Sequence, residues 1–163
     1  MKKLLIIRSV SFQQLDMNIV AIQHQFPDYR LNLLTHEHGV KLAEKYKMID
    51  KVYVYPHKSG FQWGKRVLEL QSEYFDAVII PVTNISGNGF LNVLLYSLML
   101  KTKRRYICNL ISEIKGITSS KIILNGLENT VFSVLSLIAV AVFILPVHLI
   151  LPFKLKRIEK KSY

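Results

Sequence analysis

The sequence predicts an α/β fold: a Rossmann-like, doubly wound parallel sheet followed by a C-terminal membrane-inserted helix. Two patterns carry this prediction. Short apolar runs alternate with helical patterns over residues 1–110, and a long stretch without charged residues follows at Thr130–Phe153. Alternating strands and helices form parallel sheets with right-handed crossovers. A chain of 163 residues has room for one domain and an appendage.

The expected strands are short, apolar and rich in β-branched or aromatic residues. Leu4–Ile7 is a continuous apolar run, which is typical of a strand buried on both faces. The five expected strands are Leu4–Ile7, Arg30–Thr35, Lys51–Tyr55, Asp76–Val82 and Arg105–Leu110.

Helical patterns separate these strands. The clearest has a single apolar stripe at helical spacing, formed by Leu15, Ile19, Ile22 and Phe26. The four expected helices are Phe12–Phe26, Glu37–Lys47, Gln62–Tyr74 and Phe90–Leu100. In the third of these, Val67, Leu68 and Leu70 are expected to face inward. Residues 111–129 are expected to form an irregular or partly helical connector.

The segment Thr130–Phe153 contains no Lys, Arg, Asp or Glu, and His148 is its only ionisable residue. At about 1.5 Å per residue, a helix of this length would cross a hydrocarbon core of roughly 30 Å. Pro146 and Pro152 predict a kink or a break near Leu145, because proline removes a backbone donor and clashes with the preceding turn. A kinked span and a re-entrant or in-plane helix both fit this pattern.

Charges at the two ends bear on these geometries. The tail, residues 154–163, has five basic residues and one acidic residue, which the positive-inside rule places in the cytoplasm. Lys2 and Lys3 precede only four apolar residues, too few for a secretory signal. The domain is therefore also expected to face the cytoplasm, at the cytoplasmic (inner) membrane. One crossing cannot place both ends on one side, so the charges favour a re-entrant or interfacial segment.

The net charge of +11 indicates an acidic partner. Beside a membrane segment, anionic lipid headgroups or a phosphorylated substrate are favoured over nucleic acid. Cys108 is the only cysteine, so it cannot form an internal disulfide and is expected to be a core residue of a strand.

Ligands of parallel sheets bind outside the carboxyl ends of the strands. Ser9 and Ser11 open the first helix, where free amides and the helix dipole favour an anion. A helix-capping role is equally compatible with these serines. The four expected strand-end segments are Arg8–Ser11, Thr35–His38, Pro56–Gly60 and Thr83–Gly89.

Other chemical motifs are weak. No GxGxxG is present, so neither a dinucleotide fingerprint nor any other cofactor is predicted. His36 and His38 lack a third ligand at convincing spacing, which favours loop histidines over a metal site. The turn Ser86–Gly89 could cradle a phosphate or a sugar, or simply reverse the chain.

Five stretches occur in a recognisable order: KLLIIRSVSF (Lys3–Phe12), FPD (Phe26–Asp28), IDKV (Ile49–Val52), YFDAVI (Tyr74–Ile79) and KRRYI (Lys103–Ile107). Their order and spacing resemble the N-terminal half of glycosyltransferase family 9, the lipopolysaccharide heptosyltransferases. The resemblance covers about residues 2–110. It implies one half of a GT-B enzyme, in which the N-terminal domain holds the acceptor and the C-terminal domain binds the nucleotide-sugar donor.

Two departures from the family qualify this expectation. A membrane segment follows where the family has its donor domain. The family's presumed catalytic base, an aspartate, aligns with Gln14, whose amide cannot usefully accept a proton. Asp16 is the nearest carboxylate, but two residues along a helix it points about 200° away. The residues expected to bind the acceptor are Arg8, Ser9, Ser11, Ser86 and Asn88.

The expected organisation is a glycosyltransferase N-terminal-type domain (1–110), a connector (111–129), a membrane segment (130–153) and a basic tail (154–163). The expected function is binding of a lipid-linked or phosphorylated acceptor in envelope polysaccharide or glycolipid assembly, with a separate donor-binding subunit as partner. The alternative is a catalytically degenerate membrane scaffold or partner-binding module. Whether the chain is an enzyme or a non-catalytic subunit stays open.

Overall fold

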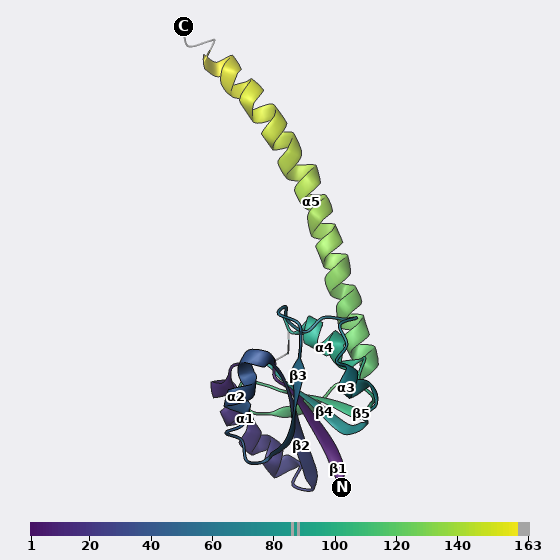
Figure 1. The fold of residues 1–163 in the computed structure, drawn as a ribbon. Coiled ribbons are helices and arrows are strands. Elements are labelled where there is room, and N and C mark those ends of the chain that lie inside the picture. Colours follow the sequence, from purple (N-terminus) through teal and green to yellow (C-terminus); the bar gives the residue numbers. More distant parts are fainter. Residues whose placement is uncertain (86, 88, 160–163) are drawn as a thin grey trace. The chain divides into compact units, whose positions relative to one another are not determined.

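The computed structural model describes residues 1–85, 87 and 89–159 (Figure 1). The chain divides into two compact units, Met1–Ile123 and Leu124–Tyr163. The first unit is the α/β domain, and nearly all of the second belongs to one long helix. We describe each by itself.

A six-stranded sheet forms the centre of the domain, in the order β3-β2-β1-β4-β5-β6. Strands β1 to β5 are parallel, and β6 runs antiparallel to β5. The strands are β1 (Lys2–Ile7), β2 (Tyr29–His36), β3 (Ile49–Tyr55), β4 (Phe75–Pro81), β5 (Thr102–Cys108) and β6 (Ile114–Gly116). The predicted α/β class with a mostly parallel sheet is confirmed.

Helices cover both faces of the sheet (Figure 1). The helices of the domain are α1 (Phe12–Gln25), the 3-10 helix η1 (Glu37–Gly39), α2 (Val40–Ala43), α3 (Leu68–Gln71) and α4 (Leu91–Ser97), and α5 (Ser119–Glu159) begins at the end of the domain. Alternate residues of β1 enter different cores: Leu5 packs on the face of α3 and α4, and Leu4 packs on the face of α1. Burial on both faces explains why β1 is a continuous apolar run rather than an alternating one.

Several predictions about the core are confirmed. The four stripe residues of α1 are all at most 8% exposed, and Cys108 is fully buried at the end of β5. Burial raises the pKa of the Cys108 thiol, which also accepts a contact from the Asn18 amide. This cysteine therefore belongs to the core.

The helix predicted at Gln62–Tyr74 is largely wrong. Only Leu68–Gln71 is helical, and Leu68 is 81% exposed, whereas Val67 and Leu70 are buried as expected. Gly64 adopts a positive φ of 88°, which a right-handed helix does not contain. The residues before α3 therefore form a loop instead of a helix. At the end of this loop, Val67 and Leu70 are buried in the core. The helix predicted at 37–47 is similarly shortened to η1 and α2.

The connector predicted at 111–129 is more ordered than expected, since it contains β6 and the start of α5. Asn109 organises the turn into β6: its Oδ1 accepts from the amides of Ile111 at 3.2 Å and Glu113 at 2.9 Å. A three-residue edge strand gives little periodic signal, so the sequence pattern did not predict β6.

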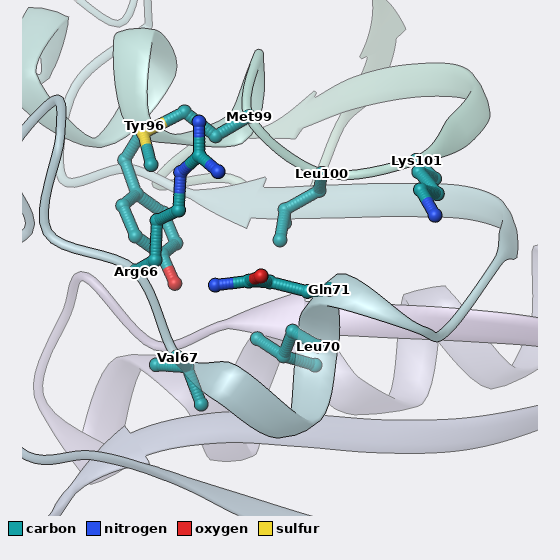
Figure 2. A pocket seen from close by; sticks show the side chains of 8 residues that line it. All are labelled: Arg66, Val67, Leu70, Gln71, Tyr96, Met99, Leu100 and Lys101. Carbon is teal, nitrogen blue, oxygen red and sulfur yellow. The ribbon is translucent and has the colours of Figure 1, made fainter.

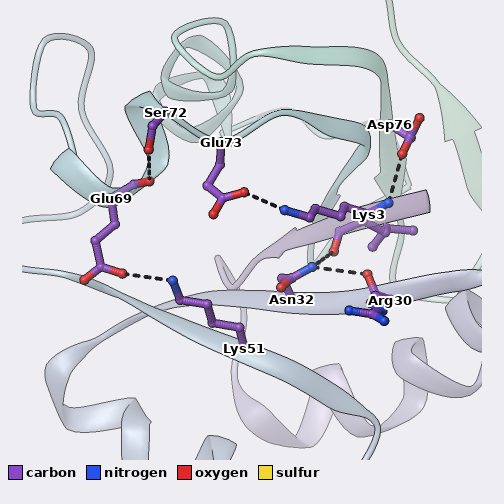
Figure 3. Close-up of polar contacts among 9 residues, drawn as sticks. Lys3, Arg30, Asn32, Lys51, Glu69, Ser72, Glu73 and Asp76 are labelled. Carbon is purple, nitrogen blue, oxygen red and sulfur yellow. Dashed lines mark hydrogen bonds and ion pairs between the residues drawn. The ribbon is translucent and has the colours of Figure 1, made fainter. Parts of the chain in front are cut away.

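Ion pairs join β1 and β3, near their amino-terminal ends, to α3 and the segment that follows it (Figure 3). The Lys3 ammonium lies 2.8 Å from Glu73, and the Lys51 ammonium lies 3.4 Å from Glu69. Asp76 accepts the backbone amide of Lys3 at 2.9 Å. Two lysines at this edge of the sheet, Lys3 and Lys51, are thus paired with carboxylates.

The helix α5 runs without interruption from Ser119 to Glu159. The break predicted near Leu145 is therefore absent. A proline removes one backbone hydrogen bond, and the bonds of the adjoining turns can hold a helix together around it.

Residues Ser119–Val142 form a helix long and apolar enough to cross a membrane by length and composition. From Ile123 on, its large apolar side chains are exposed; Phe132 is 66% and Leu137 75% accessible. The hydroxyls of Thr130 and Ser133 donate to carbonyls four residues back, at 2.9 and 2.8 Å. Such bonds satisfy hydroxyls within the helix itself, as an apolar surrounding requires.

Candidate functional site

A cavity of about 410 Å³ lies at the carboxyl ends of the strands. Sheet order reverses at β1, which has β2 on one side and β4 on the other, and such a reversal opens a crevice above the sheet. The cavity is lined by Arg8, Ser9, Val10, His36, His38, Lys58, Gly60, Phe61, Gly89, Asn92 and Val93. These come from the ends of β1, β2 and β3 and from the stretch that leads from Gly89 into α4, so all four strand-end segments predicted from the sequence contribute residues.

Arg8 is held in place by neighbours on several sides. Its Nε donates to Thr35 Oγ1 at 2.7 Å, and its Nη1 donates to the Val10 carbonyl at 3.0 Å. Its guanidinium carbon lies 4.6 Å from the ring centre of Phe12. A third hydrogen bond joins Nη2 to His38 Nε2. The three hydrogen bonds use three of the five N–H groups of Arg8. One N–H on each terminal nitrogen is left for a ligand.

No carboxylate neutralises Arg8 within the described chain. The lining of the cavity includes no Asp or Glu, and none of the ion pairs among the described residues involves Arg8. Burial lowers the pKa of Arg8, but a guanidinium keeps its charge at neutral pH. A partly buried cation without a counter-ion has the chemistry to hold an anion.

Gly39 allows this arrangement, because a Cβ there would overlap Thr35 Oγ1 and approach Arg8 Nη2 to 3.3 Å and Phe12 to 3.3 Å. Only glycine permits η1 to pass so close to the arginine and its hydroxyl partner. Gly39 therefore shapes the pocket of the Arg8 side chain.

His36 and His38 stack with ring centres 5.6 Å apart. Arg8 can only donate, so His38 Nε2, 3.3 Å from Arg8 Nη2, is the acceptor and its proton is on Nδ1. The Ser59 carbonyl can only accept, so His36 Nε2, at 3.2 Å, carries the proton. Burial lowers the pKa of His36 despite this bond, and the charges of Arg8 and His38 lower it further. Hydrogen bonding thus fixes both tautomers.

The predicted serines have structural partners. Ser9 lines the cavity, but its hydroxyl donates to the Pro81 carbonyl and ties β1 to β4. Ser11 caps α1 by accepting the Gln14 amide at 3.2 Å, and it is not among the lining residues. Of the remaining predicted residues, Ser86 and Asn88 lie outside the described residues.

Gln14 and Asp16 lie away from the cavity. Gln14 is 8% exposed, and its Nε2 donates to Asn18 Oδ1 at 2.8 Å and to the Leu110 carbonyl at 3.1 Å. The Asp16 carboxylate accepts the hydroxyl of Tyr46. Gln14 therefore stabilises the junction between α1 and the end of β5, and neither residue lines the strand-end cavity.

The sequence placed His36, His38 and Lys58 in strand-end segments but not among the residues expected to bind the acceptor, and Phe61 lies outside those segments. Their position after β2 and β3 was the available signal, since strand-end residues of parallel sheets converge. Among the described residues, no group of three or more His, Cys, Asp or Glu side chains is placed to hold a metal ion.

Comparisons with protein-family models, curated proteins and solved structures give no match for this chain. The chemistry of the cavity itself must therefore indicate the ligand.

Proposed function

We propose that the domain Met1–Ile123 binds the phosphate of a lipid-linked or phosphorylated glycan acceptor at the strand-end cavity, at the surface of a membrane to which α5 attaches the chain. One observation carries the proposal: Arg8 is fixed by Thr35, Val10 and His38, faces a cavity without acidic lining, and retains two free N–H groups. Paired donors on a rigid guanidinium match two oxygens of a phosphate.

The setting supports a role in envelope polysaccharide or glycolipid assembly. The strand order β3-β2-β1-β4-β5 is that of a Rossmann-like sheet, as in one half of a GT-B glycosyltransferase. The acceptor of such a pathway is held by a lipid, and a membrane helix would bring the cavity to it. The domain would face the cytoplasm, as the basic tail indicates. A separate subunit would bind the nucleotide-sugar donor.

Calorimetry on the purified full chain would test the ligand class. Phosphorylated glycolipid headgroups should bind, and nucleotide-sugars should neither bind appreciably nor turn over. Arg8→Ala should weaken headgroup binding by about 1.5–3 kcal/mol, the value of a charge-assisted hydrogen bond. Arg30→Ala, which removes an exposed arginine on β2, is the matched control. Tight nucleotide-sugar binding by the isolated chain would overturn the acceptor assignment.

Attachment is tested separately. A chain ending at Glu128 should remain soluble after cell lysis, whereas the full chain should require detergent. A high-salt wash removes attraction between basic residues and lipid, which contributes about 1 kcal/mol per residue. If the shortened chain still sedimented with membranes after this wash, α5 would not be the main anchor.

A second candidate is a non-catalytic scaffold or partner-binding module. It is favoured by the buried, hydrogen-bonded Gln14 at the family's base position and by exposed apolar residues on α1, Met17 at 60% and Val20 at 67%. Binding of neither ligand class in the calorimetry, with co-purification of one partner dependent on Met17 and Val20, would favour this candidate.

A further inference from the structure

A second cavity, of about 310 Å³, lies between the segment that leads into α3 and the end of α4 (Figure 2). It is lined by Arg66, Val67, Leu70, Gln71, Tyr96, Met99, Leu100 and Lys101. None of these residues lines the strand-end cavity. The two cavities are therefore separate places on the domain.

The floor of this second cavity is apolar and rigid. Val67, Leu70 and Leu100 are each at most 7% exposed and belong to the core of that face of the sheet. Tyr96 is 1% exposed, and its ring packs edge-on against Tyr55, with centres 5.6 Å apart. A floor built from core residues is preformed, as small-molecule sites usually are.

The hydroxyl of Tyr96 has no hydrogen bond to any residue in the described part of the chain. Every fully buried side-chain nitrogen or oxygen in that part has a partner, so the Tyr96 oxygen is open to the cavity rather than sealed. In Figure 2 this hydroxyl and the Gln71 amide both point into the space that the lining residues surround. A tyrosine this deep normally pairs its hydroxyl, and a ligand in the cavity can supply the partner.

Two unpaired cations stand at the rim. Arg66 and Lys101 are exposed, and neither forms an ion pair with a carboxylate of the described residues. The nearby carboxylate Glu69 is engaged by Lys51. An apolar floor, a free phenol and two free cations together match a ligand with an apolar body and an anionic end.

We propose that this cavity is a second binding site, for a small amphiphilic anion: an apolar ring or short chain carrying one phosphate or carboxylate. The apolar body lies against Leu70, Leu100 and the Tyr96 ring. The anionic group is held by Arg66 and Lys101, and an oxygen of the ligand pairs with the Tyr96 hydroxyl. This proposal does not depend on the function of the strand-end cavity.

Trp63 provides a reporter beside the site. It is the only tryptophan, is 63% exposed, and precedes Gly64, whose amide donates to the Met99 sulfur at 3.1 Å. The probe is phenyl phosphate, added to the full chain in nanodiscs of zwitterionic lipid, with empty nanodiscs as blank. Phenol and inorganic phosphate are titrated in parallel, because each carries only half of the proposed chemistry.

We expect phenyl phosphate to change Trp63 fluorescence saturably and at lower concentration than phenol or inorganic phosphate. The double variant Arg66→Gln, Lys101→Gln should weaken binding at least about tenfold, because two charge-assisted contacts are lost. Tyr96→Phe, which keeps the ring packing, should weaken it about threefold. Lys103→Gln and Arg8→Lys should leave it unchanged.

Three results would overturn the proposal: no saturable change at millimolar phenyl phosphate, a change that persists undiminished in the double variant, or a change that disappears in Arg8→Lys. The last would place the probe in the strand-end cavity. Both rim substitutions are on exposed side chains, and circular dichroism of each variant would check that the fold is kept.

Discussion

Some cations at the amino-terminal edge of the parallel sheet have carboxylate partners, whereas Arg8 at the opposite edge has none among the described residues. At the amino-terminal edge, Lys3 and Lys51 are paired with Glu73 and Glu69. At the carboxyl-terminal edge, Arg8 and Lys58 line a cavity with no acidic residue in its lining. Both edges belong to one small domain, so overall basicity does not explain the contrast. Paired charges at a sheet edge stabilise a fold only weakly, whereas an unpaired and partly buried charge has the chemistry to hold an anionic ligand.

Placing a carboxylate at the carboxyl-terminal edge should have the largest effect. His38 Nε2 lies 3.3 Å from Arg8 Nη2, so the side chain of His38→Glu would reach the guanidinium and neutralise it. We expect phosphate binding to fall by about 100-fold, because a charge-assisted contact is lost and a repulsion is gained. Calorimetry with inorganic phosphate measures this change.

His57→Glu is the matched control, because the His57 ring packs on Tyr55 with ring centres 5.0 Å apart and His57 is not among the hydrogen-bond partners of Arg8 in the described chain. Phosphate affinity should fall by less than about tenfold in this variant, because only the added negative charge acts on the ligand. Equal losses in the two variants would show that general charge, rather than the Arg8 contact, governs binding.

Exchanging Arg8 for lysine should have the next largest effect. Lys keeps the charge, but it cannot hold Thr35, Val10 and His38 while presenting two donors in a plane. Phosphate affinity should fall about tenfold in Arg8→Lys. Arg30→Lys at the start of β2 should leave the dissociation constant unchanged, and a matching loss there would argue against a defined site.

Acidification should strengthen anion binding by a smaller factor, about threefold between pH 8 and pH 6. The pKa of His36 lies below its ordinary value of 6.5 through burial and the nearby charges of Arg8 and His38, and a bound anion would raise it again. Binding therefore takes up a proton, and affinity rises as pH falls through this range. Inorganic sulfate is the suitable probe, since its charge is constant here, and His36→Gln should flatten the profile.

The same pKa shift predicts the opposite trend for stability of the free protein. As pH falls below 6.5, the unfolded chain gains a proton on His36 that the folded chain resists until a lower pH. Unfolding by denaturant at pH 7 and pH 5.5 should show wild type losing more stability than His36→Gln.

The amino-terminal edge should give the smallest effects. Glu73→Gln removes the partner of Lys3, a pair whose side chains are 26% and 47% exposed. We expect a loss of about 0.5 kcal/mol in the free energy of unfolding and no change in phosphate binding. Denaturant melts and calorimetry on one variant would measure both. Phosphate binding at Lys3 in Glu73→Gln would contradict the difference between the two edges.

Features set by local periodicity could be predicted from the sequence. The apolar run of β1 and the stripe of α1 reflect burial that repeats along one element, so pattern alone was sufficient. The helix predicted at Gln62–Tyr74 failed, because Gly64 sets a backbone conformation that the apolar pattern does not record. The strand β6 was missed because it is short and depends on pairing with β5.

The candidate site likewise has features that the sequence predicted and features that it did not. Arg8 was predicted because it directly follows β1, a position that topology defines. Its contacts with Thr35 and His38 join residues about thirty positions apart, and only the paired register of β1 and β2 brings them together. Ser9 and Ser11 were placed correctly at the strand end, but their hydroxyl bonds serve β4 and α1 instead of a ligand.

Side-chain NMR of the arginines during a titration with inorganic phosphate tests the central claim most directly. The Arg8 signals, assigned through Arg8→Lys, should shift saturably and show slowed guanidinium rotation, because two donors become engaged. Exposed Arg30 and Arg104 should remain unchanged at the same concentrations. If Arg8 stayed unchanged, or if all three shifted weakly and together, the strand-end cavity would not be an anion site.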